Sequence, residues 1–274
     1  MLLGYNTNGL QNHRLPDALR LMADNGYEAV GLTLDVQHLD PFHCTAKDVS
    51  EIAVLLDQLG LTPAMETGAR FLLDPKHKHE PTLMTRDPEA RARRIEFFRR
   101  VAEIGRDLGA SVVSFFSGVD RGPSADARET LLSGVRDACA AVRAEGMIPA
   151  VEPEPGMAIA TVEEYQEVRR ELEKDGEGPM LCLDVGHLYV TGEGSPAQVI
   201  PGVAAQLAQV QLEDMRIGVH EHLLPGEGDV DFAAVFSALR KAEYAGPVCF
   251  ELSRSSHLAP HAIAICRQVW AGSR

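Results

Sequence analysis

The feature that most constrains the fold of this chain is a regular alternation of short apolar runs and longer amphipathic segments. The apolar runs have the length of buried strands, and the segments between them have the spacing of helices that pack on one face. The predicted strands are residues 2–5, 29–34, 62–65, 110–116, 148–151, 180–183, 209–212 and 248–250. The predicted helices are residues 15–25, 48–59, 89–108, 125–145, 161–174, 195–208, 232–243 and 258–270. Eight such pairs in 274 residues predict a (β/α)8 barrel, an α/β fold.

No change of composition marks a second domain, so residues 1–274 are predicted to form a single TIM-barrel domain. The main alternative is a doubly wound sheet, which requires a glycine-rich phosphate-binding turn after its first strand. The turn after the first predicted strand reads Asn6-Thr7-Asn8-Gly9 and lacks that pattern. The barrel is therefore the better interpretation.

Charge and cysteine content limit the partners and the compartment. The net charge is −14 and the isoelectric point is near 5.1, so nucleic acid and anionic membranes would be repelled. No apolar run reaches about 18 residues, and the N-terminus lacks a basic and apolar leader, so we expect neither a membrane span nor a signal peptide. The five cysteines contain no CxxC pair, which suits a reducing compartment. We therefore predict a cytoplasmic protein without nucleic-acid or membrane partners.

Polar and acidic side chains end several predicted strands, and in a barrel the carboxyl ends of all strands meet at one mouth. The residues at these ends are Glu66, Glu152, Asp184, Gln211 and Glu251. Carboxylates crowded there would raise one another's pKa values unless a cation lay among them. Oxygen-rich ligation favours Mn²⁺, Mg²⁺ or Co²⁺ over Zn²⁺. Any one of these glutamates taken alone is better explained as a salt-bridge partner on the barrel rim.

Three further segments carry charged groups, and two of them allow two interpretations. Asp184 is followed by Gly186 and His187, which indicates half of a metal or acid–base site, or an aspartate that caps a helix beside a surface histidine. The long segment 69–86, with Arg70 and Lys78, is either a solvated loop or a contact for an anionic or polyhydroxylated substrate. The basic run 91–100 is predicted to be the solvated face of a helix.

Five segments, taken together and in order, resemble those of a known family. They read Val-Glu-Pro at 151–153, Leu-Asp-Val-Gly-His at 183–187, Val-Gln-Leu-Glu-Asp-Met-Arg at 210–216, His-Leu-Leu-Pro-Gly-Glu-Gly-Asp-Val-Asp-Phe at 222–232 and Phe-Glu-Leu-Ser-Arg at 250–254. With these segments the chain resembles, over essentially its whole length, the xylose isomerase-like TIM-barrel superfamily and its sugar phosphate isomerase/epimerase group.

The resemblance implies one divalent metal ion and a set of substrate contacts. The implied metal ligands are Glu152, Asp184, Gln211 and Glu251, and the implied substrate contacts are His187 and Arg216. We also expect Glu66, Arg70 and His222, at the same mouth, to contact the substrate. At Gln211 the group usually carries histidine. Because an amide oxygen is a weaker ligand than imidazole for Zn²⁺, the change favours Mn²⁺ or Mg²⁺, with Co²⁺ and Zn²⁺ as alternatives, or indicates a weakened site.

Two neighbouring glutamates leave the ligand set open. Glu213 points to the same side of its strand as Gln211 and could replace it, and Glu154 stands in the same relation to Glu152.

The function implied is a metal-dependent isomerase or epimerase of a sugar, sugar phosphate or cyclitol. The metal ion would acidify the carbon next to a carbonyl, and Glu152 and Glu251 would remove and return its proton through an enediolate. A lyase or dehydratase with related chemistry and a non-catalytic barrel with a degraded metal site are alternatives. An AP endonuclease-like phosphodiesterase would need more metal ions, and although His220 and His222 could serve a second one, the third and fourth strands end without histidine. The group commonly forms homo-oligomers.

Overall fold

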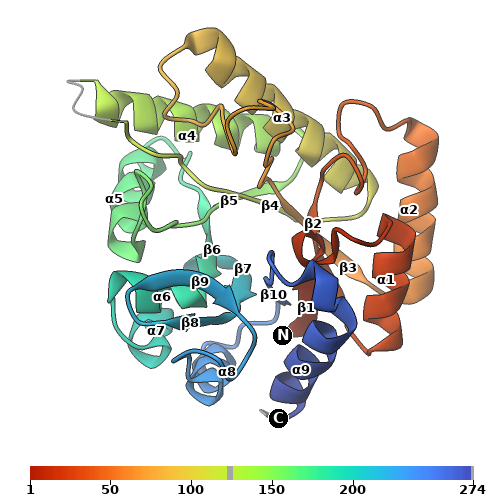
Figure 1. Ribbon diagram of the computed structural model, residues 1–274. Helices are drawn as coiled ribbons and strands as arrows, with labels where there is room; N and C mark the ends of the chain where they lie inside the picture. The colour runs from red at the N-terminus through yellow and green to blue at the C-terminus, as the bar shows by residue number, and fades with distance from the viewer. Residues whose placement is uncertain (122–125, 273–274) are drawn as a thin grey trace.

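Eight parallel strands close into a barrel in the computed structural model, which describes residues 1–121 and 126–272 (Figure 1). Around the barrel the order is β1-β10-β7-β6-β5-β4-β3-β2. The strands are β1 (Leu2–Asn6), β2 (Ala29–Thr33), β3 (Thr62–Glu66), β4 (Val112–Phe115), β5 (Ile148–Val151), β6 (Met180–Asp184), β7 (Leu207–Leu212) and β10 (Pro247–Phe250). The predicted (β/α)8 barrel and all eight of its strands are confirmed.

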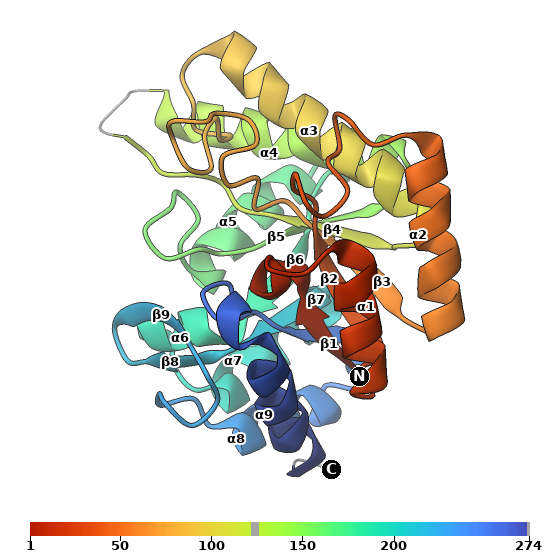
Figure 2. The same cartoon turned by 45° about the vertical axis from the view of Figure 1, so that its right-hand side comes forward.

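Helices form a ring outside the strands (Figure 2). They are α1 (Leu15–Asp24), α2 (Ala46–Leu59), α3 (Pro88–Asp107), α4 (Ala127–Ala144), α5 (Val162–Glu173), α6 (Val185–Thr191), α7 (Pro196–Val203), α8 (Phe232–Lys241) and α9 (Ala259–Gly272), with short 3-10 helices η1 (Thr7–Leu10), η2 (Ala204–Gln206) and η3 (Ser256–Leu258). Capping boxes at Thr45 and Thr161 start α2 and α5. Ala125, the predicted start of α4, lies outside the described residues. None of the helices in the described part of the chain has the length and apolar character needed to cross a membrane.

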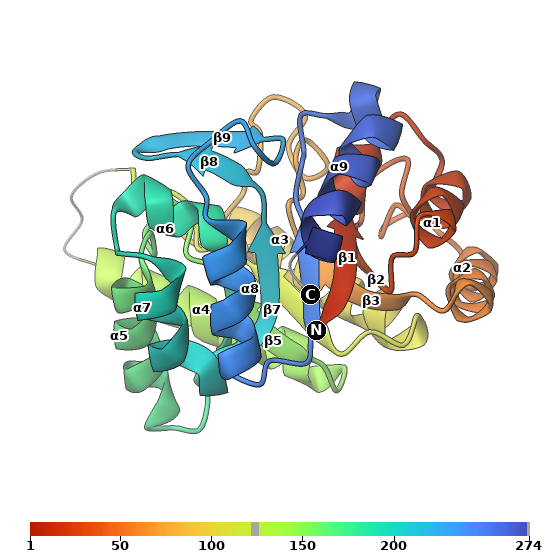
Figure 3. The same cartoon turned by 90° about the horizontal axis from the view of Figure 1, so that it is seen from below.

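A helix and a hairpin were not predicted from the sequence. α6 begins directly after β6, and an antiparallel hairpin of β8 (Asp214–Arg216) and β9 (Val219–Leu223) lies between β7 and α8. Gly218 supplies the positive φ of 73° that this turn requires. The Asp214 carboxylate accepts hydrogen bonds from the backbone N–H groups of Gly226, Gly228 and Val230. In Figure 3 the hairpin lies at the end of the barrel to which the strand arrows point.

The barrel interior changes from small apolar residues to polar ones along the strands. Ala64, Val112, Ala150 and Cys182 form a small buried cluster separate from the large core between strands and helices. Because side chains alternate along a strand, Glu66 faces the same side of β3 as Ala64, whereas Met65 packs in the outer core. The strand ends therefore direct their polar groups into the interior of the barrel mouth.

Arg94 is an exception to the prediction that the basic run 91–100 is a solvated face, whereas Arg93, Arg99 and Arg100 remain at the surface. The side chain of Arg94 is fully buried, and its guanidinium lies over three aromatic rings, 4.8–5.3 Å from their centroids. These rings belong to Phe97, Phe98 and Phe116. Nη2 of Arg94 donates a hydrogen bond of 2.8 Å to the carbonyl oxygen of Thr67. Arg94 thus holds the chain immediately after the strand that ends in Glu66.

Candidate metal centre and substrate cavity

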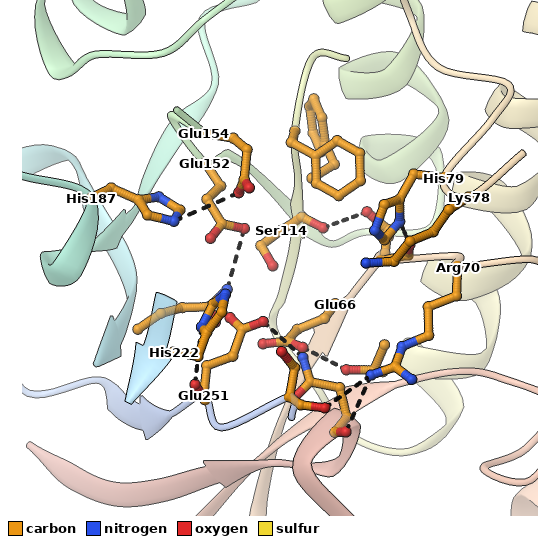
Figure 4. A pocket seen from close by; sticks show the side chains of 18 of the residues that line it. Glu66, Arg70, Lys78, His79, Ser114, Glu152, Glu154, His187, His222 and Glu251 are labelled. Atoms are coloured by element: carbon orange, nitrogen blue, oxygen red, sulfur yellow. Dashed lines mark hydrogen bonds and ion pairs between the residues drawn. The ribbon is translucent and has the colours of Figure 1, made fainter. Parts of the chain in front are cut away.

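A cavity of about 170 Å³ opens at the C-terminal ends of the barrel strands (Figure 4). Its lining includes seven of the predicted site residues, namely Glu66, Arg70, Glu152, His187, Gln211, His222 and Glu251. Asp184, which is 1 % exposed, lies within ion-pair distance of His187. A cavity of roughly 150 Å³ is large enough for benzene, so this one suits a small molecule rather than a polymer.

Asp184 caps a helix, one of the two interpretations that the sequence allowed, and His187 beside it is buried rather than on the surface. Oδ1 of Asp184 accepts the backbone N–H of His187 at 3.2 Å and caps α6, whereas Oδ2 has no hydrogen-bond partner in the described structure. Nδ1 of His187 lies 2.9 Å from the carbonyl oxygen of Pro153, which can only accept, so Nδ1 carries the proton. Nε2 is left with a free lone pair, 3.4 Å from Oδ2 of Asp184. A histidine oriented in this way is typical of metal and acid–base sites.

The amide of Gln211 is engaged in hydrogen bonds within the protein. Its Oε1 accepts a 2.7 Å hydrogen bond from Nδ2 of Asn6, and its Nε2 donates to Oε2 of Glu152 at 3.3 Å. The side chain of Asn6 has this space because Gly31 carries no Cβ. A Cβ at Gly31 would lie only 1.9 Å from Oδ1 of Asn6. The structure therefore places Gln211 as a link between Asn6 and Glu152, with its oxygen engaged in a hydrogen bond, and its role as a metal ligand stays a prediction.

Glu213, which the sequence analysis gave as a possible replacement for Gln211, lies beside Asp184. It is fully buried, and neither of its carboxylate oxygens has a hydrogen-bond partner among the described residues. Burial raises its pKa well above the usual range, and the neighbouring Asp184 raises it further. For Asp184 burial is again the largest single effect, but its polar neighbours, His187 first among them, together outweigh it and lower the pKa. Gly186 leaves room for this carboxylate, because a Cβ there would lie 2.0 Å from Oε1 of Glu213.

The other glutamates of the cavity are also crowded. Burial is the main cause that raises the pKa of Glu66 and of Glu152, and Glu251 is the next largest for both. Oε2 of Glu66 accepts a 2.6 Å hydrogen bond from the hydroxyl of Thr33, and Oε1 of Glu251 accepts one of 2.8 Å from Nδ2 of Asn8. Asn6 and Asn8, at the end of β1 and just after it, were missed by the sequence prediction although the rule of polar strand ends would have found them.

The unpaired atoms provide a direct test of whether a cation fits. One ligand atom from each of Asp184, Glu213 and Glu251 lies within 4.8 Å of the others, and the same holds for the group Glu152, Asp184 and His187. Buried carboxylates without partners are costly unless a cation compensates them. This oxygen-rich set with one imidazole fits a hard or borderline divalent ion. A third group, Glu154, His187 and His220, also lines the cavity.

Arg216 does not reach the cavity. Its side chain is 54 % exposed, and its Nη1 pairs with Oε2 of Glu221 at 3.2 Å within the hairpin. Arg216 is not among the residues that line the cavity and lies instead in the hairpin of β8 and β9, which was not foreseen from the sequence. The cations that do line the cavity are Arg70, Lys78 and Arg254.

Comparison with known proteins identifies the family. The model of the xylose isomerase-like TIM barrel family matches residues 19–269. The chain belongs to this family. The resemblance expected from the sequence is therefore confirmed over nearly the whole chain.

Relatives within this fold include sugar epimerases. The chain is 21 % identical over 263 residues to the L-ribulose-5-phosphate 3-epimerase UlaE of Shigella flexneri, covering 94 % of this chain and 89 % of that protein. Among solved structures, a D-tagatose 3-epimerase-like protein has a TM-score of 0.79 at 17 % identity and covers 100 % of this chain and 98 % of its own.

Two other solved structures share the fold. The IOLI protein with a bound zinc atom has a TM-score of 0.78 at 19 % identity and covers 100 % of this chain and 98 % of its own. The probable 3-DHS dehydratase AsbF of Bacillus anthracis has a TM-score of 0.79 at 14 % identity, with 99 % of each chain covered.

Proposed function

We propose that the protein is a divalent-metal-dependent epimerase of a small ketose or ketose derivative. The observation that carries this proposal is that two glutamates, Glu152 and Glu251, line one small cavity. Buried oxygens of Asp184 and Glu213 that accept no hydrogen bond from the described residues lie within reach of them. The relative UlaE, an epimerase of a ketose phosphate, supports the substrate class. An isomerase would use the same groups and differ only in the carbon to which the proton returns.

The metal ion would be held by Glu152, Asp184 and Glu251, as predicted, and by Glu213 in place of Gln211. When bound, it supplies a Lewis acid that polarises the substrate carbonyl and acidifies the neighbouring C–H bond. Four carboxylates favour Mn²⁺ or Mg²⁺ over Zn²⁺. The zinc in the IOLI structure supports a divalent ion in this fold without determining which one this chain uses.

The two glutamates would move the proton. Burial raises the pKa of Glu152, which brings a carboxyl closer to the operating pH at which general acid–base catalysis is most efficient. Glu251 is held by the amides of Asn8 and Asn6, whose Nδ2 atoms lie 2.8 and 3.4 Å from its two oxygens. A base on one face of the substrate carbon and an acid on the other would invert its configuration. Nε2 of His187, free to accept, would bind a substrate hydroxyl.

The experiment that tests the proposal is solvent exchange. Ketopentoses, ketohexoses and their phosphates are incubated with the Mn²⁺-loaded protein in D₂O, and deuterium at the carbon next to the carbonyl is followed by NMR. Glu152→Gln and Glu251→Gln should each lower the rate by roughly 10²–10⁴-fold, because each removes one acid–base group. Glu163→Gln, at an exposed position on α5, is the matched control. Full exchange in Glu251→Gln would refute this assignment.

A dehydratase is the second candidate, because the fold neighbour AsbF is a probable dehydratase. It would use the same proton abstraction and then expel a hydroxyl from the next carbon. The two reactions are separated by mass, since an epimerase product retains the mass of its substrate in H₂O and a dehydratase product lacks one water.

A further inference from the structure

The cavity has a cationic side that the proposed proton transfer does not use. Arg70 and Lys78 come from the segment between β3 and α3, and Arg254 follows β10. In Figure 4 the labelled Arg70 and Lys78 lie across the cavity from Glu152 and Glu154. Within residues 1–121 and 126–272, none of the three cations forms an ion pair with a carboxylate. The cavity is thus polarised, with carboxylates on one side and cations that form no ion pair within those residues on the other.

The groups that hydrogen-bond to Arg70 are neutral, and the carboxylates that attract Arg70 and Lys78 lie beyond ion-pair distance. Nη2 of Arg70 lies 3.4 and 3.5 Å from the carbonyl oxygens of Asn8 and Ser253, and its Nη1 donates to the amide oxygen of Gln11. Burial lowers the pKa of Lys78, the nearby Arg70 and Arg254 lower it further, and Glu154 and Glu251 act in the opposite direction. Three cations gathered at one side of a cavity create a local positive potential that attracts an anion.

The segment that carries Arg70 and Lys78 is held in a costly backbone conformation. Ala69, Arg70 and His79 have positive φ angles of 46°, 41° and 67°, which non-glycine residues rarely adopt. The backbone N–H of His79 donates to the carbonyl of Arg70 at 2.6 Å, and the ring Nδ1 of His79 donates to the carbonyl of Gly68. Strain that is maintained by such contacts is characteristic of functional sites. Here it directs the two cations toward the cavity.

We propose that this cationic side binds a terminal oxyanion of the substrate, so that the substrate is an anionic ketose with its carbonyl end at the glutamates and its anionic end at Arg70, Lys78 and Arg254. The inference rests on the proposed function, whose substrate class it narrows. A phosphate monoester fits better than a carboxylate, because its charge of about −1.5 to −2 and its three oxygens match three cations, two of them guanidinium groups. A sugar acid would offer the same chemistry with one charge.

The test uses Lys78→Gln and Arg254→Gln, which remove exposed cations that make no intramolecular ion pair in the described structure. The matched control is Lys76→Gln, an exposed lysine of the same segment that does not line the cavity. The Mg²⁺-loaded proteins are titrated with inorganic phosphate and with acetate by calorimetry. kcat/KM is then measured for a ketopentose, its 5-phosphate and a keto acid of similar length.

Each cavity variant should weaken phosphate binding and lower kcat/KM for the 5-phosphate by roughly tenfold, as expected when one hydrogen bond to a charged group is lost. The unphosphorylated ketose should be affected less than twofold, and Lys76→Gln should behave as the wild type. A preference for the keto acid over the phosphate would assign the oxyanion as a carboxylate. Equal losses for charged and neutral substrates, or no binding of either anion, would overturn the proposal.

The outcome is distinguishable from failure of the proposed function. If phosphate binds and Lys78→Gln weakens its binding as expected while no ketose exchanges deuterium, the oxyanion site stands and the epimerase assignment fails. If neutral ketoses are epimerised and phosphate neither binds nor inhibits, the epimerase assignment stands and the oxyanion site fails.

Discussion

Gly186→Ala provides a sharp test of Glu213 as a metal ligand, because it moves that carboxylate without changing any charge. A Cβ at this position would lie 2.0 Å from Oε1 of Glu213 and 2.9 Å from Cγ and Cε of Met215. Contacts of a Cβ below 3.0 Å are essentially not seen, so the carboxylate must move by about 1 Å. Displacements of this size are enough to disrupt a preorganised site.

The expected magnitudes follow from the same geometry. Gly186 is helical within α6, so its replacement by alanine should stabilise the folded protein by about 1 kcal/mol through helix propensity. This gain offsets part of the cost of overpacking, which is about 1–3 kcal/mol. The variant should therefore fold, with a modestly lower Tm. Its affinity for Mn²⁺ should fall by roughly 10–100-fold, which is the loss seen when a residue that positions a metal ligand is mutated.

The assay is a titration with Mn²⁺ followed by electron paramagnetic resonance, together with metal content after dialysis and thermal unfolding by circular dichroism. Gly202→Ala is the matched control, because this glycine also lies in a helix, α7, and a Cβ there would meet nothing within 4 Å. If Gly186→Ala binds Mn²⁺ as tightly as the wild type and Gly202→Ala, Glu213 does not ligate the metal and the reasoning is wrong.

Three other predictions concern the same mouth. Burial raises the pKa of Glu66, Glu152 and Glu213, so the folded metal-free protein keeps protons on these carboxyls at pH values where the unfolded chain has lost them. Each pKa unit by which a folded carboxyl exceeds the unfolded one changes the free energy of unfolding by about 1.4 kcal/mol. The free energy of unfolding of the metal-free protein, measured in urea, should therefore fall as pH rises above about 4.3, and Mn²⁺ should restore it near neutral pH; a pH-independent value would contradict this. Asp184→Asn keeps a side-chain oxygen to cap α6 but loses the charge, so helix content should be retained and metal content lost, and normal metal content would exclude Asp184 as a ligand. Arg94→Ala should lower the free energy of unfolding by about 2–4 kcal/mol in urea titrations, because it leaves a cavity and an unpaired carbonyl, whereas exposed Arg93→Ala should change it little.

The barrel could be predicted from the sequence because each of its strands and most of its helices are indicated by a pattern within a short stretch of residues. Each buried strand appears as an apolar run of the right length, and the eight-fold alternation with helices leaves few other folds. Once the barrel is assumed, the residues at the strand ends are known to share a mouth. The positions of Glu66, Glu152, Gln211 and Glu251 at the ends of their strands were therefore enough to place them at one cavity.

The contacts of the side chains at the mouth depend on elements that are distant in the sequence. Gln211 looks like a ligand from its strand position, but Asn6 from β1 occupies its oxygen. The choice of Glu213 depends on the space that Gly186 leaves on the helix α6. Arg216 lies outside the cavity in an unforeseen hairpin that follows β7, and Arg94 is buried because three aromatic rings surround it.

Sequence periodicity specifies which side of a strand a residue faces, since that depends only on the backbone. It does not specify where a side chain ends, because a difference of about 1 Å between neighbouring side chains decides whether an oxygen binds a cation or an amide. In this protein the sequence alone determined the barrel and the acidic mouth. Only the tertiary structure decided which carboxylates remain unpaired and where the opposing cations lie.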